Sequence, residues 1–67
     1  MKTQQVKRRM KDMHITAGMM AQELGMDPST YYRKMAKEGE DFSALDLSVF
    51  KRVLNMDEKT AVDFLLT

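Results

Sequence analysis

Residues 16–37 read TAGMMAQELGMDPSTYYRKMAK, and this stretch decides the predicted fold. Thr16 can cap a helix that starts at the next residue, and Gly25 stands where a helix end needs a residue that tolerates a positive φ. Asp27 can accept hydrogen bonds from the free amides of a second helix, and Pro28 suits its first position, where no amide hydrogen is needed. The pattern therefore predicts two short helices joined by a tight turn, over about residues 17–24 and 28–37.

The two helices are expected to pack closely while the second one projects from the domain. A small residue at Ala21 lets the helices cross at a short distance, and Met26 fills the space between them. At about 100° per residue, Tyr31 and Met35 share the inward face of the second helix. Its outward side carries Ser29, Arg33, Ala36 and Lys37, with Thr30 and Tyr32 at its flanks. This arrangement predicts a helix-turn-helix over about residues 16–37, a shape that fits the major groove of DNA.

Apolar residues at helical spacing predict three further helices outside this stretch. The first covers about residues 3–13, the second begins after a capping-box pattern of Ser43 and Asp46 and closes at Asn55, and the third follows Asp57. Their apolar stripes are Val6, Met10 and Met13; Leu47, Phe50, Val53 and Leu54; and Ala61, Phe64 and Leu65.

The predicted fold is therefore all-α, a compact five-helix bundle with a helix-turn-helix. No alternation of β-branched and aromatic residues is long enough for a strand. The length of 67 residues predicts a single domain over residues 1–67, too small for a catalytic cleft between lobes. Met19 and Met56 have no place in the predicted stripes.

Composition argues against several classes of protein. The chain has no cysteine and a single histidine, His14, so we expect neither a disulfide nor a metal site. No nucleophile–base pattern or glycine-rich phosphate loop is present, so we expect no catalytic residue and no cofactor. No apolar stretch approaches the roughly 18 residues that span a bilayer, and no secretory signal is apparent, so we expect a cytoplasmic protein without a membrane partner.

The net charge is small, but the charged residues are unevenly distributed along the chain. Eleven basic and ten acidic residues leave a net charge of +1. Residues 1–13 hold Lys2, Lys7, Arg8, Arg9 and Lys11 against the single acid Asp12. The basic face of this first helix is either a solvated surface or a binding surface, and the sequence leaves both interpretations open.

The run AQELGMDPSTYYRKM, residues 21–35, resembles the helix-turn-helix of the Xre or Cro/CI family of phage-type regulators. The matching residues are Ala21, Leu24, Gly25, Met26, Ser29 and Thr30. The following stretch, EGEDFSALDLSVFKRVLNMDEKTAVDFLL, is similar to small Cro-like proteins from phages of Gram-positive bacteria. Two departures are Ala17, where the family usually has glutamine, and Lys34, where an apolar residue is usual.

The resemblance implies a transcription regulator that binds double-stranded operator DNA as a dimer. From their positions in the family's motif, the residues expected to contact DNA bases are Pro28, Ser29, Tyr32 and Arg33. Thr16, Ala17 and Lys37 are expected nearer the phosphate backbone. Arginine can pair bidentately with guanine, and serine can donate or accept a hydrogen bond. Val62 and Leu66 lie off the inward stripe of the last helix and are the expected homodimer contact. Such a protein would work in the bacterial host cytoplasm, at the nucleoid.

A second interpretation is a phage modulator of repression, or antirepressor, which binds a partner repressor protein. The acids Glu38, Glu40, Asp41 and Asp46 directly follow the helix that would read DNA. An acidic rim there would repel DNA and attract the basic face of a repressor. Tyr31, Tyr32, Arg33 and Met35 would then be protein anchors. An unrelated helical binding module is the third interpretation.

Overall fold

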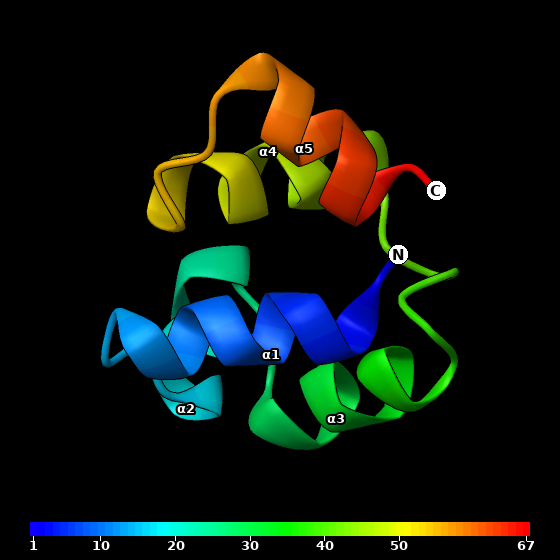
Figure 1. Ribbon diagram of the computed structural model, residues 1–67. Helices are drawn as coiled ribbons and strands as arrows, with labels where there is room; N and C mark the ends of the chain where they lie inside the picture. Colours follow the sequence, from blue (N-terminus) through cyan, green and yellow to red (C-terminus); the bar gives the residue numbers. More distant parts are fainter.

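Five α-helices and no strand make up the protein in the computed structural model, which describes residues 1–67 (Figure 1). The helices are α1 (Thr3–Asp12), α2 (Ala17–Leu24), α3 (Pro28–Ala36), α4 (Ala44–Val53) and α5 (Glu58–Leu65). The all-α, five-helix prediction is therefore confirmed. The predicted bounds differ at three ends, because α1 stops before Met13, α3 stops before Lys37 and α4 stops before Leu54.

Side-chain caps start the four later helices at the residues that the sequence indicates. The Thr16 hydroxyl accepts a hydrogen bond from the Met19 amide at 3.1 Å, and the Asp27 carboxylate accepts one from the Ser29 amide at 3.0 Å. Ser43 and Asp46 form the reciprocal capping box, and Asp57 caps α5 through the Thr60 amide at 2.7 Å. Each cap satisfies an amide that the helix itself leaves without a partner.

The first four helices end in the same way. A residue with positive φ follows each one: His14 (59°), Gly25 (70°), Glu38 (60°) and Asn55 (51°). The next amide then bonds back to a carbonyl five residues earlier, from Ile15 to Met10, Met26 to Ala21, Gly39 to Lys34 and Met56 to Lys51. This closure satisfies the last carbonyls of a helix, and in three of the four cases it also turns an apolar side chain, that of Ile15, Met26 or Met56, back toward the core. The sequence indicated Gly25 as such a position, and Asn55 as the residue that closes its helix.

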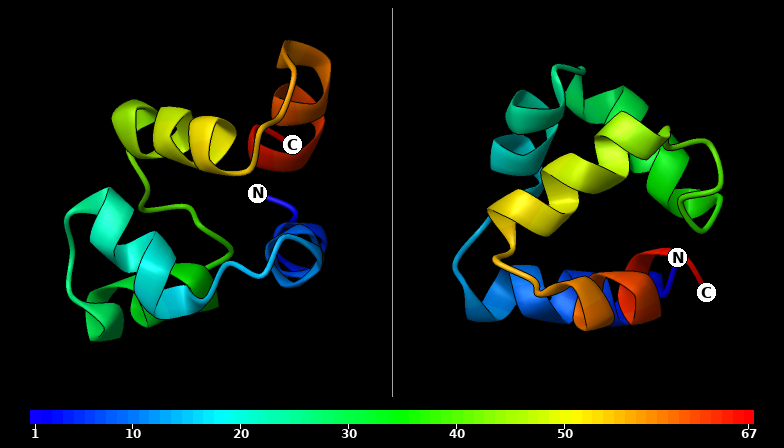
Figure 2. Two further views of the ribbon diagram at one scale, coloured as in Figure 1. Left: turned by 90° about the vertical axis from the view of Figure 1, so that its left-hand side faces the viewer. Right: turned by 90° about the horizontal axis from the view of Figure 1, so that it is seen from above.

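The helices are arranged as two groups around one core. α3 and α4 both pack against α2, and α5 lies beside α1 (Figures 1 and 2). Hydrogen bonds tie α1 to α5 at its start, since the Lys2 amide donates to the Phe64 carbonyl at 2.7 Å and the Lys2 ammonium pairs with Asp63 at 2.8 Å. The two chain ends consequently lie close together, and the Met1 amino group donates to the Thr67 carbonyl.

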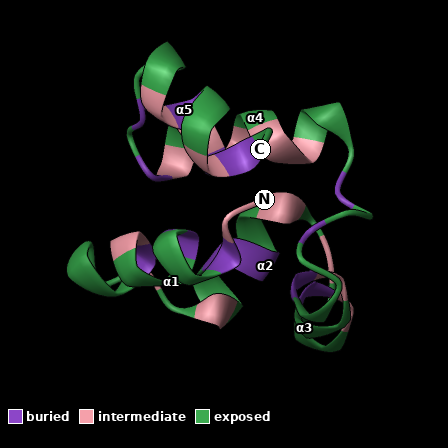
Figure 3. Cartoon of the chain, turned by 45° about the vertical axis from the view of Figure 1, so that its right-hand side comes forward, coloured by how far each residue is buried: buried purple, intermediate pink, exposed green.

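Twelve apolar residues form the buried core. Figure 3 shows the buried segments on the inward sides of the helices and in the loops on either side of α4. Two sequence assignments are corrected here. Met13 is 38% exposed because α1 ends before it, whereas Met56 is 6% exposed because the helix closure after Asn55 directs it inward. The core residues are Val6, Met10, Met20, Ala21, Tyr31, Met35, Phe42, Phe50, Leu54, Met56, Ala61 and Leu65.

Candidate nucleic-acid interface

The α2–α3 pair is rigidly connected. Three residues, Gly25 to Asp27, separate the helices, and the Met26 amide bonds to the Ala21 carbonyl at 3.0 Å. Ala21 is fully buried where the helices approach each other, as its small size requires. Tyr31 and Met35 anchor the inner face of α3 in the core. The outer face of α3 is therefore held in place and left open to solvent.

Five of the predicted contact residues lie on or beside this outer face, and all five are exposed: Pro28, Ser29, Tyr32, Arg33 and Lys37. Tyr32 is 60% exposed, and its ring meets the edge of the buried Tyr31 ring at a centroid distance of 5.8 Å. The Tyr32 ring is thus supported by Tyr31 while most of its surface remains exposed. The structure brings these five residues together as one surface, which we call the α3 face.

The polar groups of the α3 face differ in how free they are. Ser29 donates its hydroxyl hydrogen to the Asp27 carboxylate, which also holds the pKa of Asp27 below its ordinary value. Lys37 forms an ion pair with Asp41 at 3.4 Å, so part of its charge is already compensated. Arg33 has no ion pair and no hydrogen bond within the protein. Its guanidinium is the one fully available cation on this face.

Thr16 and Ala17 lie at the start of α2, apart from the outer side of α3. The Thr16 hydroxyl is occupied by the helix cap, and Ala17 is half-buried and packs against the core. Ala17 carries no polar side chain that could reach a phosphate. Both residues instead line a groove of about 620 Å³ between α1 and α3.

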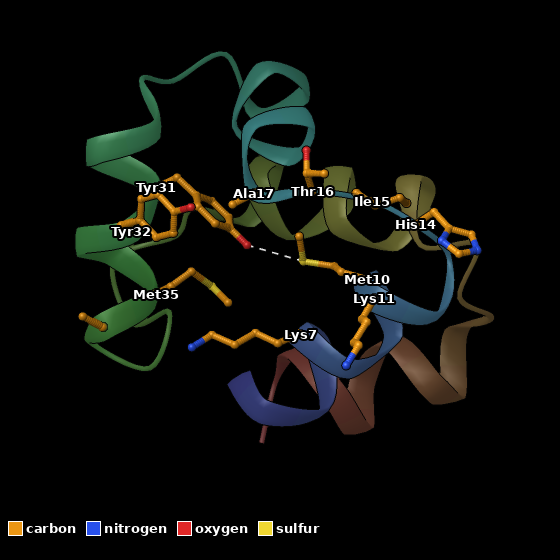
Figure 4. Close-up of a pocket in the computed structure, with 11 residues that line it drawn as sticks. Lys7, Met10, Lys11, His14, Ile15, Thr16, Ala17, Tyr31, Tyr32 and Met35 are labelled. Carbon is orange, nitrogen blue, oxygen red and sulfur yellow. Dashed lines mark hydrogen bonds between the residues drawn. The ribbon is translucent and has the colours of Figure 1, made fainter.

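This groove was not predicted from the sequence, because it depends on how α1 lies against α3. Its lining from α1 and the following loop is Lys7, Met10, Lys11, His14 and Ile15, and from α3 it is Tyr31, Tyr32, Met35 and Ala36 (Figure 4). The Tyr31 hydroxyl donates to the Met10 sulfur at 3.4 Å. Burial, helped by the neighbouring Tyr32, raises the pKa of Tyr31 to about 12.

A second feature missed from the sequence is the role of Arg9, which had been grouped with the other basic residues of the first helix. Its Nε donates to the Leu54 carbonyl at 2.8 Å and its Nη2 to the Asn55 carbonyl at 3.1 Å. Arg9 therefore joins α1 to the end of α4. No pattern in the sequence distinguishes Arg9 from Arg8, because only the tertiary structure places carbonyl groups beside one of them.

Comparison with known proteins adds no assignment: no family model matches the chain, no curated protein matches its sequence, and no solved structure matches it. The resemblance to the Xre or Cro/CI family therefore stays a prediction. No three histidine, cysteine, aspartate or glutamate side chains are grouped so that they could hold a metal ion. Each helix is too short or too polar to cross a membrane.

Proposed function

We propose that the protein is a DNA-binding transcription regulator of the phage Cro/repressor type, which inserts α3 into the major groove of an operator. One observation carries the proposal: the α3 face is exposed while the opposite side of the same helix is anchored in the core. A helix held in this way can enter a groove about 12 Å wide without disturbing the fold.

The chemistry of the α3 face suits this role. Arg33 can form the bidentate contact to guanine O6 and N7, because nothing in the protein competes for its guanidinium. Tyr32 can pack against a thymine methyl group or hydrogen-bond a phosphate. Ser29 lies at the first turn of α3, where its hydroxyl can turn from Asp27 to a base edge. Lys37 would contact the backbone only by giving up its ion pair with Asp41.

The bound form would be a homodimer that reads two half-sites of a palindromic operator. Val62 and Leu66 on α5 are exposed apolar side chains, and they supply the proposed dimer contact. Such a regulator would act in the bacterial cytoplasm, at the nucleoid, and would repress by blocking polymerase.

The proposal is tested by titrating the protein against duplex DNA from its own genetic neighbourhood over a series of salt concentrations. Specific binding should weaken steeply as salt rises, because counterions are released from the neutralised phosphates. Arg33→Ala should weaken binding by about 1–3 kcal/mol, roughly 5- to 150-fold, and relax the preference at one base pair. Arg8→Ala is the matched control, because Arg8 is an exposed, unpaired arginine on α1, outside the α3 face and the proposed dimer contact. Equal effects of the two changes would contradict the placement of α3.

A modulator of repression is the second candidate, and the loop after α3 favours it. Glu38 and Glu40 are exposed and form no ion pair, and Leu45 nearby is 79% exposed. Acidic side chains around an apolar one suit a basic protein surface better than they suit DNA. Weak binding to every duplex in the same titration, together with salt-sensitive binding to a repressor, would favour this candidate over the first.

A further inference from the structure

The groove between α1 and α3 has an apolar floor that no segment of the chain covers. Met10, Tyr31 and Met35, which are 5%, 3% and 4% exposed, form its base, and the half-buried Ile15 and Ala17 supply the more accessible apolar surface (Figure 4). Its volume of about 620 Å³ lies in the range of ligand-binding sites in proteins. Apolar surface hollowed in this way, at the side of a small domain, is a place where another molecule can bury apolar groups.

One edge of the groove is strongly cationic. Lys7, Arg8 and Lys11, which we call the α1 cations, are exposed and form no ion pair or hydrogen bond with the protein. Lys7 and Lys11 stand one helical turn apart on the same side of α1 and line the groove. The two like charges repel each other in the free protein, and carboxylates of a bound molecule would relieve that repulsion.

The floor of the groove also holds a polar group with a poor partner. The Tyr31 side chain is 3% exposed, and its hydroxyl donates only to the Met10 thioether sulfur at 3.4 Å. A thioether is a weak acceptor, so an oxygen of a bound molecule would make the better hydrogen bond. Together, the hydroxyl and the α1 cations suit a molecule that presents oxygen acceptors beside apolar groups.

The extent of the cationic surface favours a protein segment over a small molecule. The surface continues along α1 into a second concavity lined by four polar or charged residues, Gln4, Lys7, Arg8 and Lys11. From residue 4 to residue 11 a helix rises about 10 Å, so this polar surface can face two turns of a partner helix, with the α1 cations along about one of them. A helix with an apolar stripe and acidic flanks is complementary to this arrangement of an apolar floor beside a cationic edge.

We propose that this groove is a docking site for an acidic amphipathic helix of a protein partner. The apolar stripe of that helix rests on the floor between α1 and α3, its carboxylates pair with the α1 cations, and one of its oxygens accepts the Tyr31 hydroxyl hydrogen. Docking does not require that the protein bind DNA. Because Tyr32 belongs to both the groove and the α3 face, a bound partner and bound DNA would exclude each other. This consequence alone rests on the function proposed above.

The test uses a synthetic helical peptide of about 15 residues, stapled, with leucine at every third or fourth position and glutamate on both flanks of that stripe. Affinity is measured by calorimetry and the site is mapped by chemical-shift changes in the isotope-labelled full-length protein. We expect saturable binding, with shifts concentrated at groove residues. A peptide of the same composition with its leucines dispersed around the helix is the control, and it should bind at least about tenfold more weakly because it cannot present an apolar stripe.

Two variants examine the parts of the site separately. Lys7→Glu combined with Lys11→Glu should weaken binding by about tenfold or more, whereas Lys59→Glu on α5 should leave it unchanged. Tyr31→Phe keeps the buried ring and should weaken binding by about three- to tenfold without loss of folding.

The proposal is overturned by any of three results. These are equal binding of the dispersed-leucine control, shifts located outside the groove, or indifference to the paired lysine changes. Self-association of the free protein that shifts the same groove residues would also overturn it, because a second copy would then be the occupant. None of these results depends on DNA, so failure here leaves the DNA titration to be judged separately.

Discussion

Replacing Arg9 by alanine should destabilise the fold far more than replacing its neighbour Arg8. The Arg9 guanidinium donates to the carbonyls of Leu54 and Asn55, at 2.8 and 3.1 Å, and so joins α1 to the end of α4. Arg8 is exposed and makes no such contact. The two residues have the same side chain, the same helix and nearly the same place in it, so their difference isolates the tertiary contact.

The magnitude follows from the two hydrogen bonds. A hydrogen bond from a charged donor contributes about 1.5–3 kcal/mol, and the partly buried bond to Leu54 is assigned the lower end of that range. The exposed bond to Asn55 adds only about 0.5 kcal/mol, because water can replace it. Arg9→Ala should therefore lower the free energy of unfolding by about 2 kcal/mol, or the melting temperature by about 8–16 °C for a domain of this size. Arg8→Ala should change the free energy by less than about 0.5 kcal/mol.

Thermal and urea unfolding, both followed by circular dichroism, measure these differences. Arg9→Lys is an informative third variant, since an ammonium cannot reproduce the fork of a guanidinium and should recover only part of the loss. Equal unfolding free energies for Arg8→Ala and Arg9→Ala would refute the reasoning, because they would show that the contact between α1 and α4 contributes nothing measurable.

Two further predictions concern glycines and pH. Gly25→Ala should destabilise the protein by about 1–2 kcal/mol because φ is +70° there. Gly18→Ala, inside α2, should stabilise it by about 0.5–1 kcal/mol, because the added Cβ would meet only the Thr16 hydroxyl oxygen, at an ordinary contact distance of 3.9 Å. Urea denaturation that gave both changes the same sign would contradict this. Hydrogen bonding to Thr60, together with the charges of Arg9 and Lys51, holds the pKa of Asp57 below its ordinary 3.8. The stability that this carboxylate contributes is full above that value and is lost as the pH falls through its lower pKa in the folded state. Asp57→Asn should therefore unfold with a weaker dependence on acid pH, and identical pH profiles would argue against the cap as the cause.

Much of the secondary structure could be predicted because its causes are local. Thr16, Asp27, Ser43 and Asp57 cap helices with their own side chains, and Gly25 allows a left-handed turn without strain. Each of these effects acts within a few residues along the chain, so the residue types in order are enough to indicate it.

The inward and outward sides of α3 could also be predicted, since helical geometry places Tyr31 and Met35 together and Tyr32 and Arg33 away from them. Errors arose where a helix ended. Met13 was expected in the apolar stripe of α1 but lies beyond its last turn. Met56 enters the core through a turn, and helical periodicity does not describe how a turn directs its side chains.

The order of residues alone thus determined the number of helices, their caps and the exposed face of α3. Only the tertiary structure decided that Arg9 reaches the end of α4, that Lys37 pairs with Asp41, and that a groove with a cationic edge lies between α1 and α3. The physical reason is distance along the chain. Caps and periodicity join residues a turn or two apart, whereas Arg9 and Leu54 meet only because α5 packs beside α1 and carries the end of α4 to it.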